Sequence, residues 1–150
     1  IHQLVDGRPL IVGGVHIPSD RGALGHSDAD VLIHSICDAL LGAANLRDIG
    51  FHFPDTDPEY SGVDSSVLLE QTISMVRKKG YDIGNLDATI LLENPKLSPH
   101  ILAMQKKIAA ILNVDVDVVS IKATRGEKMG YIGSGEGIQA YCTVLIHQLA

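Results

Sequence analysis

The chain has 150 residues, of which 45% are hydrophobic and 20% charged, and its formal net charge at pH 7 is -6. This length, without a long charged or Pro/Ser-rich run, predicts one domain spanning residues 1–150. The negative charge argues against a nucleic-acid binder, which is usually basic. No apolar run approaches the roughly 18 residues of a membrane span, so we expect no membrane partner. Two cysteines are too few for a disulfide framework and favour a reducing compartment.

The stretch GHSDADVLIH places two histidines and two aspartates at the start of an otherwise apolar segment. Ser27 is predicted to cap a helix that runs to about Ala44, because its hydroxyl can accept from first-turn amides. Asp30, His34 and Asp38 are four residues apart, so they share one face of that helix. A carboxylate can orient one nitrogen of such a histidine while the other binds a metal, although a buried histidine without a metal is more common.

Helical spacing and alternation predict the remaining elements. A second helix is expected from a cap at Asp64 or Ser65 to about residue 79, and a third from Ser98 as cap, with Pro99 in its first turn, to about residue 112. Alternating patterns predict strands at residues 86–93, 119–124 and 138–146, and a hairpin at 9–17 around two glycines. The pattern indicates an α+β fold, with a mixed β-sheet and helices on one face.

Polar segments follow two of the predicted strands, NPK at residues 94–96 and KATRGEK at 122–128. If these strands are parallel neighbours, both segments emerge at one sheet edge, where ligand sites of such sheets usually lie. Lys96, Thr124 and Arg125 would then converge on an anion, and Glu127 could hold a divalent cation. The later GSGEG segment precedes a strand instead of a helix, which excludes a dinucleotide or P-loop site.

Four segments together carry a specific signal, namely GHSDADVLIH, DIGFHFPDTDP, NPKLSPH and KAT..E..GYIG.GEGI. They resemble those of the 2-C-methyl-D-erythritol 2,4-cyclodiphosphate synthases of non-mevalonate isoprenoid biosynthesis, and the resemblance covers essentially the whole chain. It implies a cyclising phosphorus-oxygen lyase that converts 4-diphosphocytidyl-2-C-methyl-D-erythritol 2-phosphate to the 2,4-cyclodiphosphate and releases CMP. It further implies a homotrimer with active sites between subunits. We expect a bacterial cytoplasmic location, with the plastid stroma as the alternative.

The resemblance also implies two metal sites and two catalytic residues. Zn²⁺ would be held by His2, His34 and an aspartate two residues before His2, in an upstream segment that would also carry the family's first strand. Mg²⁺ or Mn²⁺ would be held by Glu127. His26 is expected beside the reacting phosphate, and Arg125 stands where many members have a second threonine, so it would give a cationic contact to phosphate.

Substrate-binding residues are implied in three groups. The methylerythritol phosphate end is assigned to His2, His26, Ser27, Asp48, Ile49, Gly50, Phe53, Pro54, Asp55, Thr56 and Asp57. The cytidine diphosphate end is assigned to Leu92, Glu93, Asn94, Pro95, Lys96, Leu97 and Ser98, joined by Ala123 and Thr124 from an adjacent subunit. Substrate contacts are also expected from Arg125, Gly126 and Glu127. Tyr131 and Ser134 would lie beside the trimer axis, where many members carry arginine in place of Ser134, so we expect weak binding of isoprenoid diphosphates there.

Two other function classes remain open. A metal-dependent phosphoester hydrolase would use the same zinc to activate water and would give a linear product. A catalytically silent trimer that binds a metal or a nucleotide would bind cytidine nucleotides without turnover.

Overall fold

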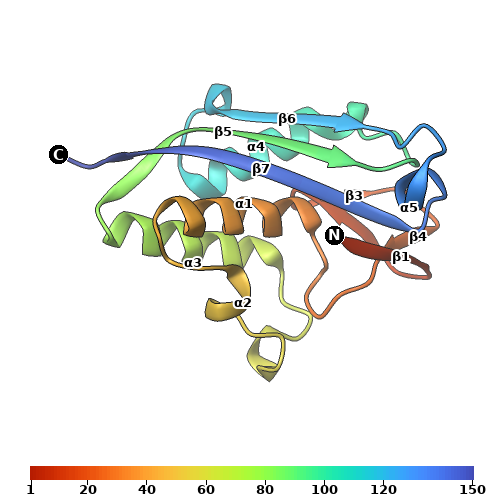
Figure 1. Cartoon of the computed structure of the whole chain (residues 1–150), viewed down its shortest axis with the longest axis horizontal. Coiled ribbons are helices and arrows are strands. Elements are labelled where there is room, and N and C mark those ends of the chain that lie inside the picture. The colour runs from red at the N-terminus through yellow and green to blue at the C-terminus, as the bar shows by residue number, and fades with distance from the viewer.

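A five-stranded mixed sheet forms the centre of the computed structural model, which describes residues 1–150 (Figure 1). The strand order is β4-β1-β7-β5-β6. The strands are β1 (His2–Asp6), β4 (Arg21–Ala23), β5 (Tyr81–Leu91), β6 (Val119–Thr124) and β7 (Gly137–Gln148). Only β5 and β6 run parallel, and the other neighbours are antiparallel. A separate hairpin pairs β2 (Leu10–Val12) with β3 (Val15–Ile17), as predicted.

The long helices lie together on one face of the sheet (Figure 1). They are α1 (Val31–Ala43), α3 (Ser65–Lys78) and α4 (Ile101–Leu112). The short helices are α2 (Ile49–His52) and α5 (Gly130–Gly133), and 3-10 turns occur at η1 (Pro58–Tyr60), η2 (Ser98–His100) and η3 (Val116–Val118). The α+β fold with helices on one face is therefore confirmed. None of these helices combines the length and the apolar character needed to cross a membrane.

Alternation along β7 separates the packed face of the sheet from its bare face. Ile138 is fully buried, and Ala140 and Cys142 pack at the margin of the hydrophobic core under the helices. Tyr141 and Leu145 point to the other face and are 60% and 65% exposed. Because successive strand residues point to opposite faces, the bare face of β7 carries Tyr141 and Leu145 among the polar residues Gln139, Thr143 and His147. The bare face is the surface that no element of this chain covers.

Two predicted helix starts are wrong. Helix α1 begins at Val31, and its N-cap is Asp30, whose carboxylate accepts from the Ile33 amide. The expected cap Ser27 lies in the preceding loop and accepts instead from the Ala29 amide, at 3.3 Å. Ala29 has a φ of 58°, which is incompatible with a right-handed helix, so the helix cannot include it.

The third long helix also starts later than predicted. Ser98 and Pro99 belong to the 3-10 turn η2, and α4 follows from Ile101 without a side-chain cap. For α3, by contrast, the structure selects Asp64 from the two predicted caps, because its side chain accepts from the Ser66 amide.

The strands differ from the prediction at the chain's beginning and along β5. Strand β5 starts at Tyr81, because its antiparallel pairing with β7 extends from Tyr81 opposite Gln148 to Leu91 opposite Gln139. Strand β1 lies within the chain, whereas we expected the first strand upstream of it. Both β1 and β4 are short and lack a clear alternating pattern. Their extended conformation therefore depends on pairing with each other and on the pairing of β1 with β7.

Candidate active site

A cavity of about 420 Å³ opens at the N-terminal end of α1. Its walls come from β1, the loop before α1, α1 itself, α2, the loop after α2, η1 and α3. The lining residues are His2, Gly25, His26, Ser27, His34, Ile49, Gly50, Phe53, Asp55, Tyr60 and Leu68. Eight of these carry predicted substrate or metal roles, and the structure brings them together. Sequence reasoning missed Gly25, which begins the GHSDADVLIH stretch but was given no role, and it missed Tyr60 and Leu68, which lie outside the four motifs and reach this wall only through packing.

His2 and His34 face each other in this cavity. The Nε2 atom of His2 lies 3.2 Å from Nδ1 of His34. Burial, and secondarily the neighbouring His34, lower the pKa of His2 to about 4, and burial also lowers the pKa of His34. Both rings are therefore neutral at pH 7, which is the form that binds metals.

The spacing of the two nitrogens fits a zinc site. Ligand nitrogens about 2.0–2.1 Å from a tetrahedral zinc ion lie about 3.3 Å from each other. The observed separation of 3.2 Å is close to that value. No group of three His, Cys, Asp or Glu side chains that could hold a metal ion occurs in the chain, so this pair would supply two of the four ligands of a tetrahedral site.

The carboxylates predicted to orient His34 have other partners, so that part of the prediction is wrong. Asp30 is fully buried and accepts from the amides of Gly13, Gly14 and Ile33. Asp38 accepts from the Ile49 amide at 2.8 Å. The backbone amides near these carboxylates need hydrogen-bond acceptors. They therefore bind the Asp30 and Asp38 carboxylates in preference to the neutral His34 ring one helical turn away. The Nε2 atom of His34 instead meets two serine hydroxyls, described below.

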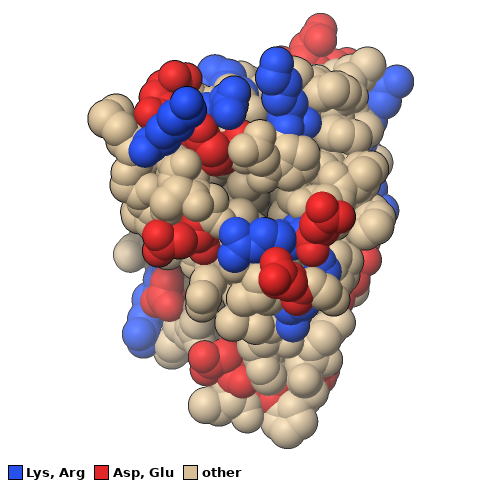
Figure 2. All heavy atoms as spheres, turned by 90° about the vertical axis from the view of Figure 1, so that its right-hand side faces the viewer, with Lys and Arg blue, Asp and Glu red and all other residues tan.

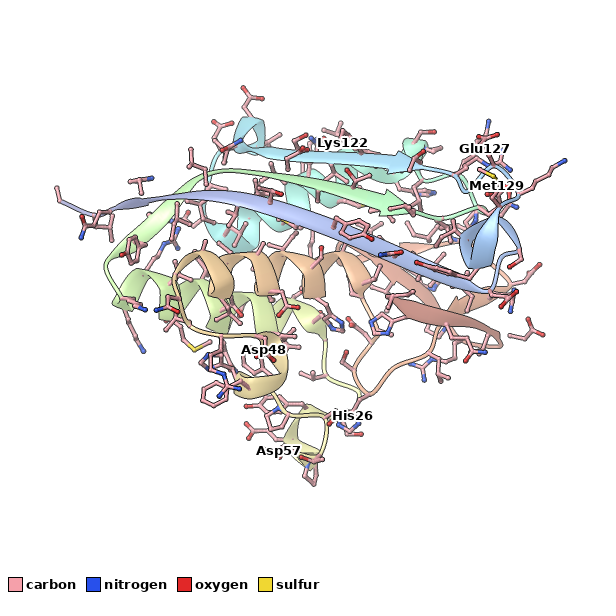
Figure 3. The ribbon with its side chains drawn as sticks, in the orientation of Figure 1. His26, Asp48, Asp57, Lys122, Glu127 and Met129 are labelled. Atoms are coloured by element: carbon pink, nitrogen blue, oxygen red, sulfur yellow. The ribbon has the colours of Figure 1, made fainter.

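The acidic loop borders the same cavity. His26 Nε2 lies 3.4 Å from the Asp57 carbonyl oxygen, and the Asp57 side chain accepts from the Glu59 amide at 3.0 Å. Figure 3 shows His26, Asp48 and Asp57 on the α2 side of the molecule. Asp48 is exposed immediately before α2, and Pro54 and Thr56 lie in the loop beside Asp55. The structure thus places this group of predicted residues in or beside one cavity.

A second cavity, of about 150 Å³, lies where β5 and β6 end. It is lined by Leu92, Lys96, Leu97, Ser98, Ala123, Thr124 and Arg125, all of which were predicted to bind substrate. Ala123 and Thr124 were expected from an adjacent subunit, but here they line the cavity with Lys96 of the same chain. The parallel register runs from Leu86 opposite Val119 to Leu91 opposite Thr124. Both strand ends therefore meet at one edge, and the expected convergence of these side chains is confirmed.

Glu93 sits beside this cavity but faces inward. Its side chain is only 7% exposed, and its Oε2 accepts from the Gly126 amide at 2.8 Å. Its Oε1 forms an ion pair with Arg125 Nη2 at 3.3 Å. The carboxylate is thus occupied by protein donors, and it anchors the Arg125 guanidinium beside the cavity. Asn94 and Pro95 line a different cavity, with Arg21 and Gly135.

Glu127 extends from the exposed loop after β6, at the upper right of Figure 3, whereas His26 is at the bottom of that view. On the face where these strand ends emerge, Lys and Arg side chains are interspersed with Asp and Glu, and no field of one sign dominates (Figure 2). Tyr131 donates from its hydroxyl to Gln139, and Ser134 donates to Glu136 at 2.8 Å. Glu127, Tyr131 and Ser134 line neither of the two cavities.

The sequence model of the YgbB family matches residues 1–147 of this chain. The chain belongs to the YgbB family. A Bacteroides fragilis relative named 2-C-methyl-D-erythritol 2,4-cyclodiphosphate synthase is 56% identical over 149 residues, which cover 99% of this chain and 94% of the relative. The resemblance of the four motifs is therefore confirmed along the whole chain.

Solved structures of YgbB-type proteins agree with this fold. A CDP-bound 2C-methyl-D-erythritol-2,4-cyclodiphosphate synthase has a TM-score of 0.89 and 36% identity, covering 97% of this chain and 95% of that one. The bifunctional IspDF of Campylobacter jejuni has a TM-score of 0.95 and 40% identity. The match covers 99% of this chain and 40% of that longer protein.

The lowered histidine pKa values predict how zinc binding responds to pH. Burial lowers the pKa of His2 to about 4 and also lowers the pKa of His34 below its usual range. An exposed histidine would be about half protonated at pH 6.5, so two exposed rings would together release about one proton on binding zinc. We expect titration calorimetry at pH 6.5, in buffers of different ionisation enthalpy, to show less proton release from these two rings than that. Release of about one proton per zinc would contradict the assignment.

Proposed function

We propose that this YgbB-family protein closes the 2,4-cyclodiphosphate ring of methylerythritol with release of CMP. In this reaction an oxygen of the 2-phosphate forms a bond to the β-phosphorus, and the bond from that phosphorus to the oxygen bridging to CMP breaks. The electron pair of the broken bond leaves with CMP, so no protein nucleophile is needed. The observation that carries the proposal is the neutral His2–His34 pair in the wall of a cavity that also holds His26 and Asp55.

The main physical obstacle is repulsion between the reacting phosphates. Two unit charges 4 Å apart repel by about 4 kcal/mol at an effective dielectric of about 20. We propose that His2 and His34 hold Zn²⁺, and that Glu127 together with substrate diphosphate oxygens holds Mg²⁺ or Mn²⁺. When bound, such cations supply Lewis-acid neutralisation worth several kcal/mol.

The protein's own side chains bind and orient the substrate. His26 lies at the cavity wall, where its ring can donate a hydrogen bond to charge that develops on phosphate. Phe53 is buried and packs edge-on against Tyr60, with ring centroids 5.4 Å apart, so this part of the wall is apolar. Lys96 and Arg125 supply cationic donors in the second cavity, where they suit the diphosphate of the cytidyl group. Holding both substrate ends in place supplies the proximity that ring closure needs.

We infer that a complete site requires more than one copy of the chain. The two cavities share no lining residue, and Glu127 lies at the top of Figure 3 whereas His26 lies at the bottom. The exposed Tyr141 and Leu145 on the bare face of β7 provide an apolar surface for a second copy. A homotrimer in the bacterial cytoplasm, with active sites between subunits, is the assembly that we propose.

Phosphorus NMR tests this proposal directly. The protein is incubated with 4-diphosphocytidyl-2-C-methyl-D-erythritol 2-phosphate, Zn²⁺ and Mg²⁺, and the phosphorus signals are followed with time. We expect the paired signals of the cyclic diphosphate together with CMP. A linear phosphate product would support the hydrolase alternative. Binding of cytidine nucleotide without turnover would support the catalytically silent trimer.

The Glu93–Arg125 ion pair predicts a coupled effect on nucleotide binding. Arg125→Ala should weaken CDP binding by about tenfold, as expected when one charged hydrogen bond to phosphate is lost. Glu93→Gln should weaken it by a smaller factor, because Arg125 remains present but loses its anchor. In the double variant the second change should add little, since both act through the same guanidinium. Calorimetric titration with CDP measures all three, and strictly additive losses would show that the two residues act separately.

A further inference from the structure

We propose that Ser65, held by Asp28, is a positioning residue that fixes the ring tautomer of His34 and directs its Nδ1 lone pair toward His2. The inference deepens the proposed metal site and rests on it for its functional meaning. It assigns a role to Asp28, in the loop before α1, and to Ser65, the first residue of α3. Neither residue was among the predicted site residues.

Asp28 ties the start of α1 to the start of α3. Its backbone N–H donates to the Val63 carbonyl oxygen at 3.1 Å, and its Oδ2 accepts from the Ser65 amide at 3.0 Å. Its Oδ1 accepts from the Ser65 hydroxyl and from the Asp30 amide. Ser65 is fully buried at the first position of α3, so water does not compete for its hydroxyl. The Ser65 hydroxyl is therefore held in one orientation.

The direction of the hydrogen bonds follows from the single proton of that hydroxyl. An ionised carboxylate only accepts, so Ser65 must donate its proton to Asp28. The Oγ atom of Ser65 also lies 2.9 Å from Nε2 of His34, and toward this nitrogen it can act only as an acceptor. The ring proton of the neutral imidazole is consequently on Nε2, and Nδ1 carries a lone pair.

That lone pair is the one that faces His2. His34 Nδ1 is the atom 3.2 Å from Nε2 of His2, so the assigned tautomer presents it as a metal ligand. The other tautomer would place a hydrogen on Nδ1 and prevent ligation there. Partners that fix a ligand's tautomer in this way typically change metal affinity about 10–100-fold when they are mutated.

A second hydroxyl near the same nitrogen does not determine the tautomer. Ser27 Oγ lies 3.2 Å from Nε2 of His34 and accepts from the Ala29 amide. No carboxylate accepts the Ser27 proton, so this hydroxyl can face Nε2 either as donor or as acceptor. Only Ser65 has its proton committed elsewhere, which is why the inference rests on Ser65 and Asp28.

The decisive measurement is the tautomer of His34 in the metal-free protein. Protein labelled with ¹⁵N-histidine is chelator-treated, and long-range ¹H–¹⁵N spectra at pH 7.5 distinguish protonated from unprotonated ring nitrogens. In the wild type we expect a protonated Nε2 and an unprotonated Nδ1 at His34. Ser65→Ala should give a mixture of the two tautomers, and competition with a chelator should show zinc affinity reduced about 10–100-fold.

Ser66→Ala is the matched control, since Ser66 is the next residue of α3 and its buried Oγ has no hydrogen-bond partner. This variant should keep the wild-type tautomer and zinc affinity. If Ser65→Ala does not fold, Asp28→Ala decides, because it removes the acceptor of the Ser65 proton, leaves that proton free to point at His34 and should likewise mix the tautomers. An unchanged tautomer in the folded Ser65→Ala or Asp28→Ala variant would overturn the inference.

The test separates this inference from the proposed reaction. The tautomer is read without substrate and without metal, so its result stands whether or not the protein makes a cyclic product. A wild-type protein with the expected tautomer but no turnover would contradict the proposed function alone. A turning-over enzyme whose His34 carries its proton on Nδ1 would contradict the inference alone.

Discussion

His34→Ala is expected to lower kcat for ring closure by about 10³-fold or more, because loss of a Lewis-acid contribution of about 4 kcal/mol corresponds to that factor. The variant removes one of the two neutral imidazoles whose nitrogens lie 3.2 Å apart. His2 alone would leave a zinc ion with a single protein nitrogen in this chain's cavity wall. Turnover is measured by release of CMP at saturating substrate, and bound zinc is measured in the purified protein.

His16→Ala provides the comparison, because His16 is an exposed residue of β3 that lines neither cavity. It should leave both turnover and zinc content unchanged. Circular dichroism would show that His34→Ala is folded. If folded His34→Ala, without zinc, retained more than about a tenth of wild-type kcat, a loss under 1.4 kcal/mol, the metal role would be wrong.

Asp30→Ala is expected to lower the free energy of unfolding by about 4 kcal/mol, since buried donors left without a partner cost about 1–3 kcal/mol each. Three amides would lose their acceptor, those of Gly13 at 2.9 Å, Gly14 at 2.6 Å and Ile33 at 3.0 Å. The first two belong to the β2–β3 turn, where both glycines have positive φ, and the third belongs to α1. Asp30 thus joins the hairpin to the helix that carries His34. Urea denaturation at one fixed protein concentration measures the change, because association also contributes to stability.

Two further variants make this measurement specific. Asp38→Ala removes one bond, to the Ile49 amide, from an exposed position and should cost less than about 1.5 kcal/mol. Asp30→Asn keeps an oxygen for two amides but points its NH₂ at the third, so we expect a loss between those of the two alanine variants. An Asp30→Ala loss no larger than that of Asp38→Ala would contradict the role of the buried carboxylate.

The same carboxylate predicts a pH dependence. Burial raises the pKa of Asp30 from 3.8 to about 7, and the three amides oppose that shift. Between these values the folded state binds more protons at Asp30 than the unfolded state does, so this residue's contribution to stability falls as pH rises from about 4 to 7. Asp30→Asn lacks the titrating group. The difference in unfolding free energy, wild type minus Asp30→Asn, should therefore decrease across that pH range, and a rising difference would contradict the sign.

The sequence alone determined the parts of this protein that depend on short-range patterns. Alternation located β6 and β7, and helical spacing located α3 to within a residue. The polar segments NPK and KATRGEK each follow a predicted strand, and this pattern predicted that Lys96, Thr124 and Arg125 would lie close together. The parallel pairing of β5 with β6 brings these three side chains into one cavity. The motifs around His26 and Phe53 were specific enough to indicate the family, and they line one cavity because the segments that carry them pack against the same end of α1.

Only the tertiary structure decided which partner each polar group takes. Helical spacing put Asp30 and Asp38 on the face of His34, but backbone amides from other segments claim both carboxylates. His34 is oriented instead by Ser65, 31 residues away, because α3 packs against α1. Glu93 resembles a ligand residue by position, and folding turns it inward to Gly126 and Arg125. Spacing along one segment fixes which groups can face the same way, whereas competition among donors from distant segments, set by packing, selects the bonds that form.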